Sequence, residues 1–277
     1  MLILLLGDCH GRLDLVHNAC LSARETYGVE AAIQVGDFGF YPKILHAFLH
    51  EGPRRFPIPL HVIDGNHEDH RWLNLCKHSG ASDAWAAANL FFHDRATAQV
   101  IGGLRIGFVG GALNADRRQE WAGRWLATAD GRPPLNRRRT PKSPVWANWV
   151  RDADVDRAVE LFSRETPDLL VTHSCPAGIG VGMEGAVPLI DDVERFITRA
   201  GHFSGPFHDC GEGGLSHLWT RLSQRPPLWV FGHFHRIHKR TVSGTQFVCV
   251  GSSDGSDGFN GVRSVLLDTE RRSVAIL

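Results

Sequence analysis

The sequence predicts an α/β protein in which two mixed β-sheets pack face to face, with helices on the outside. Two observations lead to this prediction. The N-terminal part alternates between short apolar runs and amphipathic segments, which is typical of strands joined by helices. Closely spaced short strands dominate the later part and indicate a meander. A chain of 277 residues with 43% hydrophobic content is large enough to bury such a core.

The N-terminal part follows a strand–helix–strand order. The run 2–6 reads Leu-Ile-Leu-Leu-Leu, and a continuous apolar run of this length fits a strand that is covered on both faces. Apolar residues recur on one face of 13–27, so this segment is predicted to be a helix. Further strands are predicted at 31–35 and 60–63, and further helices at 44–50 and about 69–78.

Later segments are shorter and indicate a different arrangement. Gly102-Gly103 signals a tight turn, so we expect Phe91-Phe92, Gln99–Ile101 and Leu104–Val109 to form short strands in a hairpin arrangement. The remaining predicted elements are helices at 155–163 and 215–223 and strands at 168–172, 228–231, 237–242, 246–250, 264–267 and 273–277.

Composition excludes several classes of protein. Lys plus Arg equals Asp plus Glu, 30 each, so overall charge indicates no polyanionic partner. The six cysteines form no CxxC pair and no dense framework, which favours a reducing, cytoplasmic location. The run 2–6 is too short for a signal sequence or a membrane span, so we expect no membrane association. Histidine stands out at 16 residues, and it is the commonest metal ligand.

Two stretches interrupt the predicted single domain of residues 1–277, at about 114–151 and 175–214. The first has nine basic residues against three acidic ones and four tryptophans, and the second is rich in glycine. Both lie beside candidate ligand positions in the sequence, so both are candidate walls of the site that those positions would form. The basic, Trp-rich insertion could bind nucleic acid through phosphate charge and base stacking. Because net charge is balanced overall, a solvated insertion whose tryptophans cover the domain is favoured.

Five short segments, far apart in the chain, carry side chains that bind divalent metals. Each follows an apolar run, and functional groups in open α/β sheets gather beyond the carboxyl ends of the strands. We therefore expect all five segments to share one edge of the sheet system. They are Gly7–Gly11, Gly36-Asp37, Gly65–Glu68, Thr172-His173 and Gly232–His235.

Alternation along an extended backbone would place Asp8 and His10 on one side, and His233 and His235 likewise. The same alternation points Cys9 away, as a small core residue. The other histidines are scattered and fit surface or hydrogen-bonded positions better than ligand positions; they include His46, His50, His61, His70, His78 and His93.

Taken together and in this order, the five segments resemble the calcineurin-like metallophosphoesterase superfamily, in particular its small bacterial and phage members. The resemblance covers most of the chain and implies a four-layer α/β/β/α domain with two divalent metals. Manganese is the most expected metal, and Fe, Zn, Ni or Mg are compatible. The implied ligands are Asp8, His10, Asp37 and His235 for the first metal and Asn66, His173 and His233, with Asp37 as a bridge, for the second.

The resemblance implies hydrolysis of phosphoesters. Two divalent ions carry four positive charges, of which Asp8 and Asp37 neutralise two, and the remaining charge suits a phosphate. A hydroxide that bridges the metals would attack phosphorus in line, so no protein nucleophile is needed. The family's histidine that matches His67 contacts substrate and assists the leaving group. Asp64 or Glu68 is close enough in sequence to orient it.

Gly110-Gly111-Ala112 begins a loop that could reach the metals. In small bacterial and phage members of the superfamily, a similar segment precedes an insertion that contains tryptophan. Asn114 and Arg117 are therefore candidate substrate contacts, on weaker grounds than the metal ligands.

Differences from the sequence patterns of known subfamilies narrow the range of possible substrates. Protein Ser/Thr phosphatases and the related diadenosine tetraphosphatases carry Arg-Gly shortly after the second segment, whereas Phe38–Pro42 has no arginine. RNA lariat debranching enzymes are similar in Gly-Asn-His-Glu and in a His-x-x-Pro at the fourth segment, but usually have cysteine where Asp8 stands. Cyclic-nucleotide phosphodiesterases share the ligands.

Three possible functions remain after this comparison with the subfamilies. A metal-dependent phosphomonoesterase is favoured. The alternative is a phosphodiesterase or nuclease that acts on nucleic acid or nucleotides. A noncatalytic scaffold of the same fold is a third, and it is disfavoured because such a protein would be expected to have lost ligands. Oligomeric state and natural substrate are left open.

Overall fold

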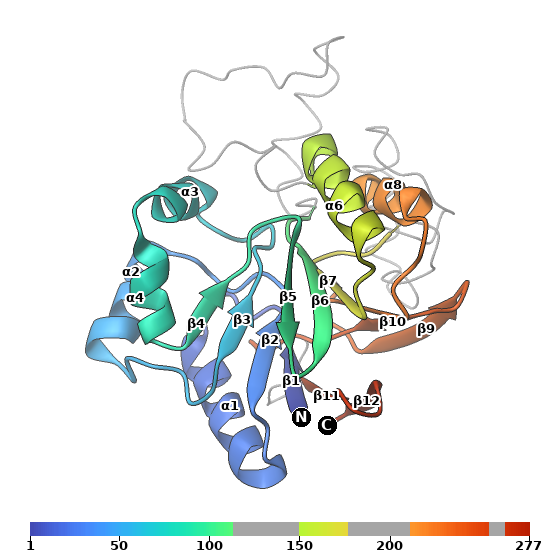
Figure 1. The fold of residues 1–277 in the computed structure, drawn as a ribbon. Coiled ribbons are helices and arrows are strands. Elements are labelled where there is room, and N and C mark those ends of the chain that lie inside the picture. The colour runs from blue at the N-terminus through green and yellow to red at the C-terminus, as the bar shows by residue number, and fades with distance from the viewer. Residues whose placement is uncertain (113–149, 177–210, 255–263) are drawn as a thin grey trace, which may run out of the picture.

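The computed structural model describes residues 1–112, 150–176, 211–254 and 264–277. Within these ranges the strands form two six-stranded sheets (Figure 1). The first sheet has the order β12 (Ser273–Ile276), β11 (Ser264–Asp268), β1 (Leu2–Leu6), β2 (Ala31–Gln34), β3 (Leu60–Val62) and β4 (Leu90–Phe92). The second has the order β5 (Thr97–Ile101), β6 (Leu104–Val109), β7 (Leu169–Thr172), β8 (Leu228–Phe231), β10 (Thr245–Cys249) and β9 (His238–Val242).

Helices cover the outer face of each sheet, which gives the four predicted layers. The first sheet is covered by α1 (Leu13–Tyr27), α2 (Pro42–His46) with the π-helical turn η1 (Ala47–Glu51), α3 (His70–His78) and α4 (Ala81–Ala87). The second is covered by α6 (Asp152–Arg164) and α8 (Gly213–Arg221). The predicted α/β fold with two mixed sheets is therefore confirmed.

The core explains the unbroken apolar run of β1. Leu4 and Leu6 pack with the helices of the first layer, while Ile3 and Leu5 pack between the two sheets. All four side chains are fully buried. A strand that is covered on both faces has no solvent side on which to place polar residues.

Strand direction brings the site together. β1, β2, β3 and β4 run parallel to one another, as do β6, β7, β8 and β10. The carboxyl ends of each set therefore lie at one edge of their sheet, and the five metal-binding segments leave from these ends.

Two elements differ from the prediction. β4 pairs in parallel with β3, with Leu60 opposite Leu90, and takes no part in the β5–β6 hairpin. The predicted turn at Gly102 and Gly103 does close that hairpin, with φ values of 58° and 79°. The pairing of β4 was mispredicted because an apolar run indicates that a strand is present but does not specify which strand lies beside it. The helix α4 was not predicted.

Several predictions fall largely or wholly outside the described ranges. They are both insertions, apart from their ends, and the substrate contacts Asn114 and Arg117. In the part of the chain that is described, no helix combines the length and the apolar character needed to cross a bilayer.

Candidate metal centre

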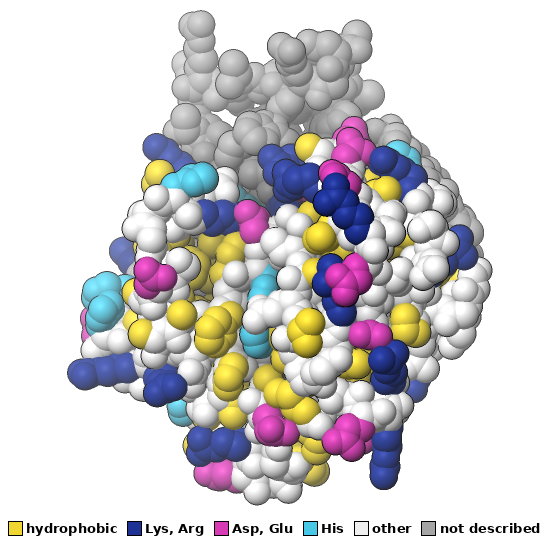
Figure 2. All heavy atoms as spheres, viewed as in Figure 1, with side chains coloured by type: hydrophobic (Ala, Val, Ile, Leu, Met, Phe, Trp, Pro, Cys, Tyr) yellow, Lys and Arg dark blue, Asp and Glu magenta, His cyan; other side chains and the backbone are white. Residues whose placement is uncertain are grey.

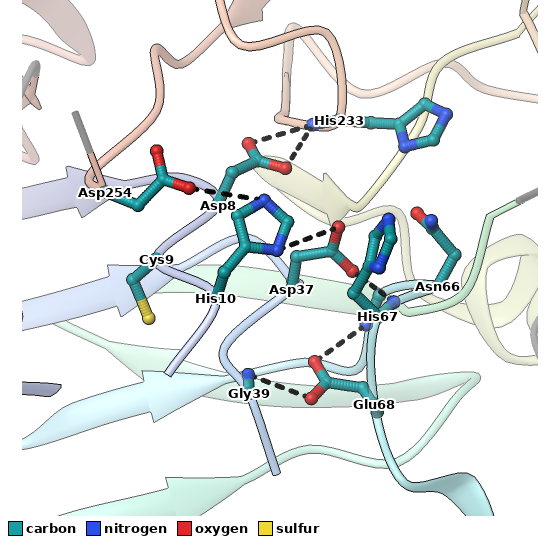
Figure 3. A network of polar contacts seen from close by, with 12 residues as sticks. Asp8, Cys9, His10, Asp37, Gly39, Asn66, His67, Glu68, His233 and Asp254 are labelled. Carbon is teal, nitrogen blue, oxygen red and sulfur yellow. Dashed lines mark hydrogen bonds and ion pairs between the residues drawn. The ribbon is translucent and has the colours of Figure 1, made fainter. Parts of the chain in front are cut away.

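The five predicted segments meet at the carboxyl ends of the strands, where the two sheets face each other. Figure 3 labels residues of the first, second, third and fifth segments. Asp8 follows β1, Asp37 follows β2, and Asn66 and His67 lie in the loop after β3. The second sheet contributes His173 after β7 and the loop after β8. All seven proposed ligands and His67 are therefore brought to one place.

The first cluster consists of Asp8, His10 and His235, whose ligand atoms all lie within 4.8 Å of one another. His10 Nε2 is 3.2 Å from His235 Nε2, and His235 Nε2 is 3.6 Å from Asp8 Oδ1. The Asp8 carboxylate also accepts the backbone N–H of His233 at 3.0 Å, which fixes its orientation. These three residues can hold one divalent ion.

The second cluster consists of Asp37, His173 and His233. His173 Nε2 lies 3.3 Å from Asp37 Oδ2 and 3.1 Å from Asn66 Oδ1. The other ring nitrogen, Nδ1, donates to the carbonyl oxygen of Val35 at 2.8 Å. A backbone acceptor on Nδ1 fixes the tautomer and leaves Nε2 as the ligand atom.

Asp37 lies at the junction of the two clusters. Its Oδ2 is 3.3 Å from His173 Nε2 in the second cluster and 3.9 Å from His10 Nδ1 in the first. Its Oδ1 accepts the backbone N–H of His67 at 2.7 Å. One carboxylate therefore faces both clusters, which is the position that a bridging ligand needs.

The backbone at these ligands is left-handed rather than extended. The φ values are 35° at Asp8, 47° at His10, 52° at Asp37, 70° at His233 and 52° at His235. The predicted extended backbone is therefore wrong. Asp8 and His10 share a cluster as expected, whereas His233 and His235 fall in different clusters. Residues other than glycine adopt such φ values at a cost of about 1–3 kcal/mol each, and functional sites are where such strain gathers.

Three glycines next to the ligands have no side chain where a ligand residue of another segment packs. A Cβ atom on Gly36 would lie 2.4 Å from His173 Nδ1, and one on Gly65 would lie 2.1 Å from Asp37 Oδ1. A Cβ atom on Gly232 would lie 2.6 Å from Asp8 Oδ2. The sequence suggested only that these glycines permit sharp turns, and the structure adds that they admit close contact.

Burial and charge shift the pKa values of the cluster residues strongly. Burial raises the pKa of Asp8 to about 6, although His173 and His235 oppose the shift. Burial would also raise the pKa of Asp37, but the facing His173 outweighs it and holds that pKa well below the ordinary value. Asp37 in turn outweighs the effect of burial on His173 and raises its pKa to about 10. Buried negative charge is thus compensated by positive charge.

The donor set fits divalent metals of borderline hardness. It offers carboxylate oxygen, amide oxygen and imidazole nitrogen, which suit ions such as Mn, Fe and Zn better than soft ions. The thiol of Cys9 donates to the carbonyl oxygen of Phe38 at 3.0 Å and is fully buried, so it is a core residue rather than a ligand. Cys175 is likewise buried.

His67 lies beside the first cluster. Its ring centroid is 5.1 Å from that of His10. Its backbone is held at both ends, because its N–H donates to Asp37 Oδ1 and its carbonyl oxygen accepts the Tyr41 hydroxyl at 2.6 Å. This geometry places an imidazole next to the metal centre on a rigid support.

The two carboxylates considered as orienting groups for His67 have other partners. Glu68 accepts the backbone N–H groups of Phe38, Gly39 and Phe40 at 2.5–2.9 Å and so holds the loop that follows Asp37. Asp64 Oδ2 accepts two N–H groups of the buried Arg95, at 2.6 and 3.0 Å. Arg95 also lies 3.4 Å from Asp154 at the start of α6. This ion pair was not predicted from the sequence, and it joins the loop before Asn66 to a helix that covers the second sheet.

A further carboxylate reaches the centre. Asp254 Oδ2 lies 3.7 Å from His10 Nε2 (Figure 3). The sequence analysis missed Asp254, although a signal existed. The apolar strand β10 leads through Val250 to Gly251, much as β1 leads to Gly7 before Asp8.

The sequence matches the calcineurin-like phosphoesterase family over residues 1–237. The chain belongs to this family. Membership and the two clusters together identify a metal-dependent phosphoesterase.

Two curated relatives of this calcineurin-like phosphoesterase are lariat debranching enzymes. It is 33% identical to that of Arabidopsis thaliana over 187 residues, which cover 67% of this chain and 38% of the relative. It is 24% identical to that of Schizosaccharomyces pombe over 252 residues, which cover 83% of this chain and 47% of the relative. The chain thus spans less than half the length of each, and the predicted distant similarity to these enzymes is confirmed.

Solved structures share the fold of this phosphoesterase. A protein of Thermus thermophilus aligns with a TM-score of 0.54 at 14% identity, covering 100% of this chain and 97% of its own. The phosphopantetheinyl hydrolase of Mycobacterium tuberculosis aligns with a TM-score of 0.50 at 14% identity, covering 97% and 96%. At this identity the likeness concerns the fold alone.

Proposed function

We propose that the protein hydrolyses phosphodiesters with two divalent metal ions held by the two clusters. The observation that carries this proposal is the position of Asp37 Oδ2, which faces a histidine of each cluster. When bound, two divalent ions held by these clusters would supply a nucleophile at neutral pH and neutralise charge on the phosphoryl oxygens.

The chain's own residues divide into two groups of ligands. Asp8, His10 and His235, with Asp37, would hold the first ion, and Asn66, His173 and His233, again with Asp37, would hold the second. The bonds from the His233 N–H to Asp8 and from His173 Nδ1 to the Val35 carbonyl support this assignment, since they orient ligand atoms before any metal binds.

His67 is proposed to act on the leaving group. As an imidazolium it would donate a proton to the departing alkoxide oxygen. Its support from Asp37 and Tyr41 favours this role, because a proton donor must be held within hydrogen-bond reach of the leaving atom.

Diesters are proposed as the substrate class because both curated relatives are named for debranching lariats. Hydrolysis of monoesters, which the sequence analysis favours, stays a prediction and is the other outcome of the assay below. Nucleic acid as a partner and a cytoplasmic location also stay predictions. On the face shown in Figure 2, acidic and basic side chains of the described residues are interspersed rather than gathered into one basic patch.

The test compares a diester and a monoester of the same phenol. Protein stripped with a chelator and reloaded with Mn²⁺ would be assayed with bis-p-nitrophenyl phosphate and p-nitrophenyl phosphate. We expect two ions per chain and a higher kcat/KM for the diester. Activity on the monoester alone would contradict the diester proposal. Bound metal without turnover of either ester would favour a scaffold instead.

A further inference from the structure

The loop after β10 forms a sixth segment of the metal centre, built from Gly251 to Asp254. It is attached to the loop that carries Asp8. The Ser253 N–H donates to the carbonyl oxygen of Gly7 at 3.0 Å, and Ser252 Oγ lies 3.2 Å from that of Asp8. A Cβ atom on Gly7 would lie 2.7 Å from the Gly251 carbonyl oxygen, so the two backbones are in direct contact. The sixth segment is therefore fixed relative to the first.

The Asp254 carboxylate is held facing the first cluster. Its Oδ1 accepts the hydroxyl of Ser252, and its backbone N–H donates to Ser252 Oγ at 3.2 Å. Its Oδ2 lies 3.7 Å from His10 Nε2, and its side chain is only 13% exposed. It does not join the group formed by Asp8, His10 and His235, whose ligand atoms lie within 4.8 Å of one another. Asp254 is thus beside the ligands rather than among them.

A third carboxylate changes the charge balance of the centre. Two divalent ions bring four positive charges, whereas Asp8, Asp37 and Asp254 bring three negative ones and a hydroxide bound to the metals would bring a fourth. Asp254 therefore leaves the centre one charge less positive than Asp8 and Asp37 alone would. A phosphomonoester, which is dianionic above its second pKa of about 6, loses more attraction from this change than a singly charged phosphodiester does. The nearby guanidinium of Arg12 does not alter this balance, because it pairs with Asp14 at 3.3 Å.

We propose that Asp254 is a specificity-determining residue that makes the centre select singly charged phosphodiesters over doubly charged phosphomonoesters. This inference rests on the two-metal centre of the proposed function. The physical basis is the repulsion between the carboxylate and the second negative charge of a monoester. At separations of several ångströms and an intermediate dielectric, such repulsion changes a binding constant by about tenfold.

Direct binding tests the proposal without relying on turnover. Calorimetric titration of the Mn²⁺-loaded protein at about pH 8 would compare orthophosphate with dimethyl phosphate, which carries one charge. We expect Asp254→Asn to bind orthophosphate about tenfold more tightly and to bind dimethyl phosphate within about threefold of the parent. Asp254→Glu, which keeps the charge, should retain the parent ratio.

A matched control removes an exposed carboxylate far from the centre. Asp83→Asn on α4, on the outer face of the first sheet, should leave both affinities unchanged. An equal change for both anions in Asp254→Asn, or no change, would overturn the proposal. Loss of one Mn²⁺ per chain in that variant would also overturn it, because Asp254 would then be a ligand.

The same variants separate this inference from the proposed function. If the parent hydrolyses diesters but the Asp254→Asn protein keeps the parent ratio of affinities, only the role of Asp254 is wrong. If the parent hydrolyses monoesters alone, the diester proposal fails, and the anion titrations still report whether Asp254 repels the second charge.

Discussion

Two buried groups of histidines differ in their neighbours. In the metal centre, His173 faces Asp37 at 3.3 Å. In the first sheet, His61 of β3 contacts His93 with 2.9 Å between Nδ1 and Nε2, and the ring of His93 stacks on Phe108 at 3.9 Å. Both groups bring together residues distant in sequence, and each is largely shielded from water.

The difference appears in the pKa of His173, although not in that of His233, which burial lowers to about 3 within the same cluster. Asp37 overcomes burial and raises the pKa of His173 to about 10, whereas burial lowers the pKa of His61 to about 4 and that of His93 to about 3. Among the described residues, the groups able to hold a metal include His173 but neither His61 nor His93. Burial of a histidine therefore does not mark a functional site. One facing carboxylate does not mark it either, because His70 lies 3.7 Å from Asp64 and joins neither group. The metal centre differs in that several ligand atoms converge.

Replacing the shared carboxylate should have the largest effect. Asp37→Asn keeps the size of the side chain but removes the charge that faces both clusters, so we expect both ions to be lost on dialysis. The loss in kcat/KM should exceed about 100-fold, which changes outside the ligand shell can already cause. Metal content and activity would be measured together. His61→Gln is the matched control, and retention of both ions by Asp37→Asn would contradict the bridging assignment.

Removal of the imidazole next to the centre should affect turnover and leave the metals in place. His67→Ala is expected to lower kcat by about 10²–10⁴-fold, the usual range for a positioned proton donor. Its metal content should equal that of the parent. His46→Ala, which changes an exposed histidine of α2, provides the control. Turnover at the parent rate would show that His67 has no part in the reaction.

The buried pair His61 and His93, which faces no carboxylate of the described residues, should affect only the free energy of unfolding at low pH. The ordinary histidine pKa is 6.5, so the unfolded chain binds protons before the folded one does. The stability that neutral His61 and His93 contribute is complete above about pH 6.5 and is lost as the pH falls through about 4 and then 3. Within that window each group lowers the unfolding free energy by about 1.4 kcal/mol per pH unit.

Urea unfolding at several pH values would measure this slope. His93→Gln cannot bind the proton, so its unfolding free energy should fall less steeply below about pH 6.5. Its metal content should match that of the parent. An unchanged slope would mean that His93 is protonated as readily in the folded protein as in the unfolded chain.

Local patterns in the sequence predicted much of the fold. The bounds of β1 and α1 agree with the predicted 2–6 and 13–27, since a doubly covered strand and a one-faced helix each leave a complete pattern within a few turns of chain. The metal-binding segments were predictable because apolar runs end at glycine and a polar ligand. The neighbour of β4 was not, because pairing is decided by contacts with another part of the chain.

The rest of the site depends on contacts between distant residues. Asp64 and Arg95 pair across 31 positions, and nothing in either local sequence indicates the other. Asp254 belongs to no resembling segment, and two serines separate it from the glycine that ends its strand. The left-handed backbone of the ligands was also unpredictable, because only a small fraction of residues other than glycine have positive φ, even among aspartates and histidines.

The contacts over Gly36 and beside Gly232 each join an early part of the chain to a late one, so they limit when the centre can form during synthesis. Strands β1 and β2 leave the ribosome early, yet the imidazole that fills the space over Gly36 belongs to His173. The Asp8 carboxylate obtains its backbone N–H partner later still, because that group belongs to His233, 225 positions further along the chain. Until β8 and the loop after it have been made, each cluster lacks one of its two histidines, His235 in the first and His233 in the second. Neither cluster is therefore complete before His233 has been added to the chain, and the first also needs His235.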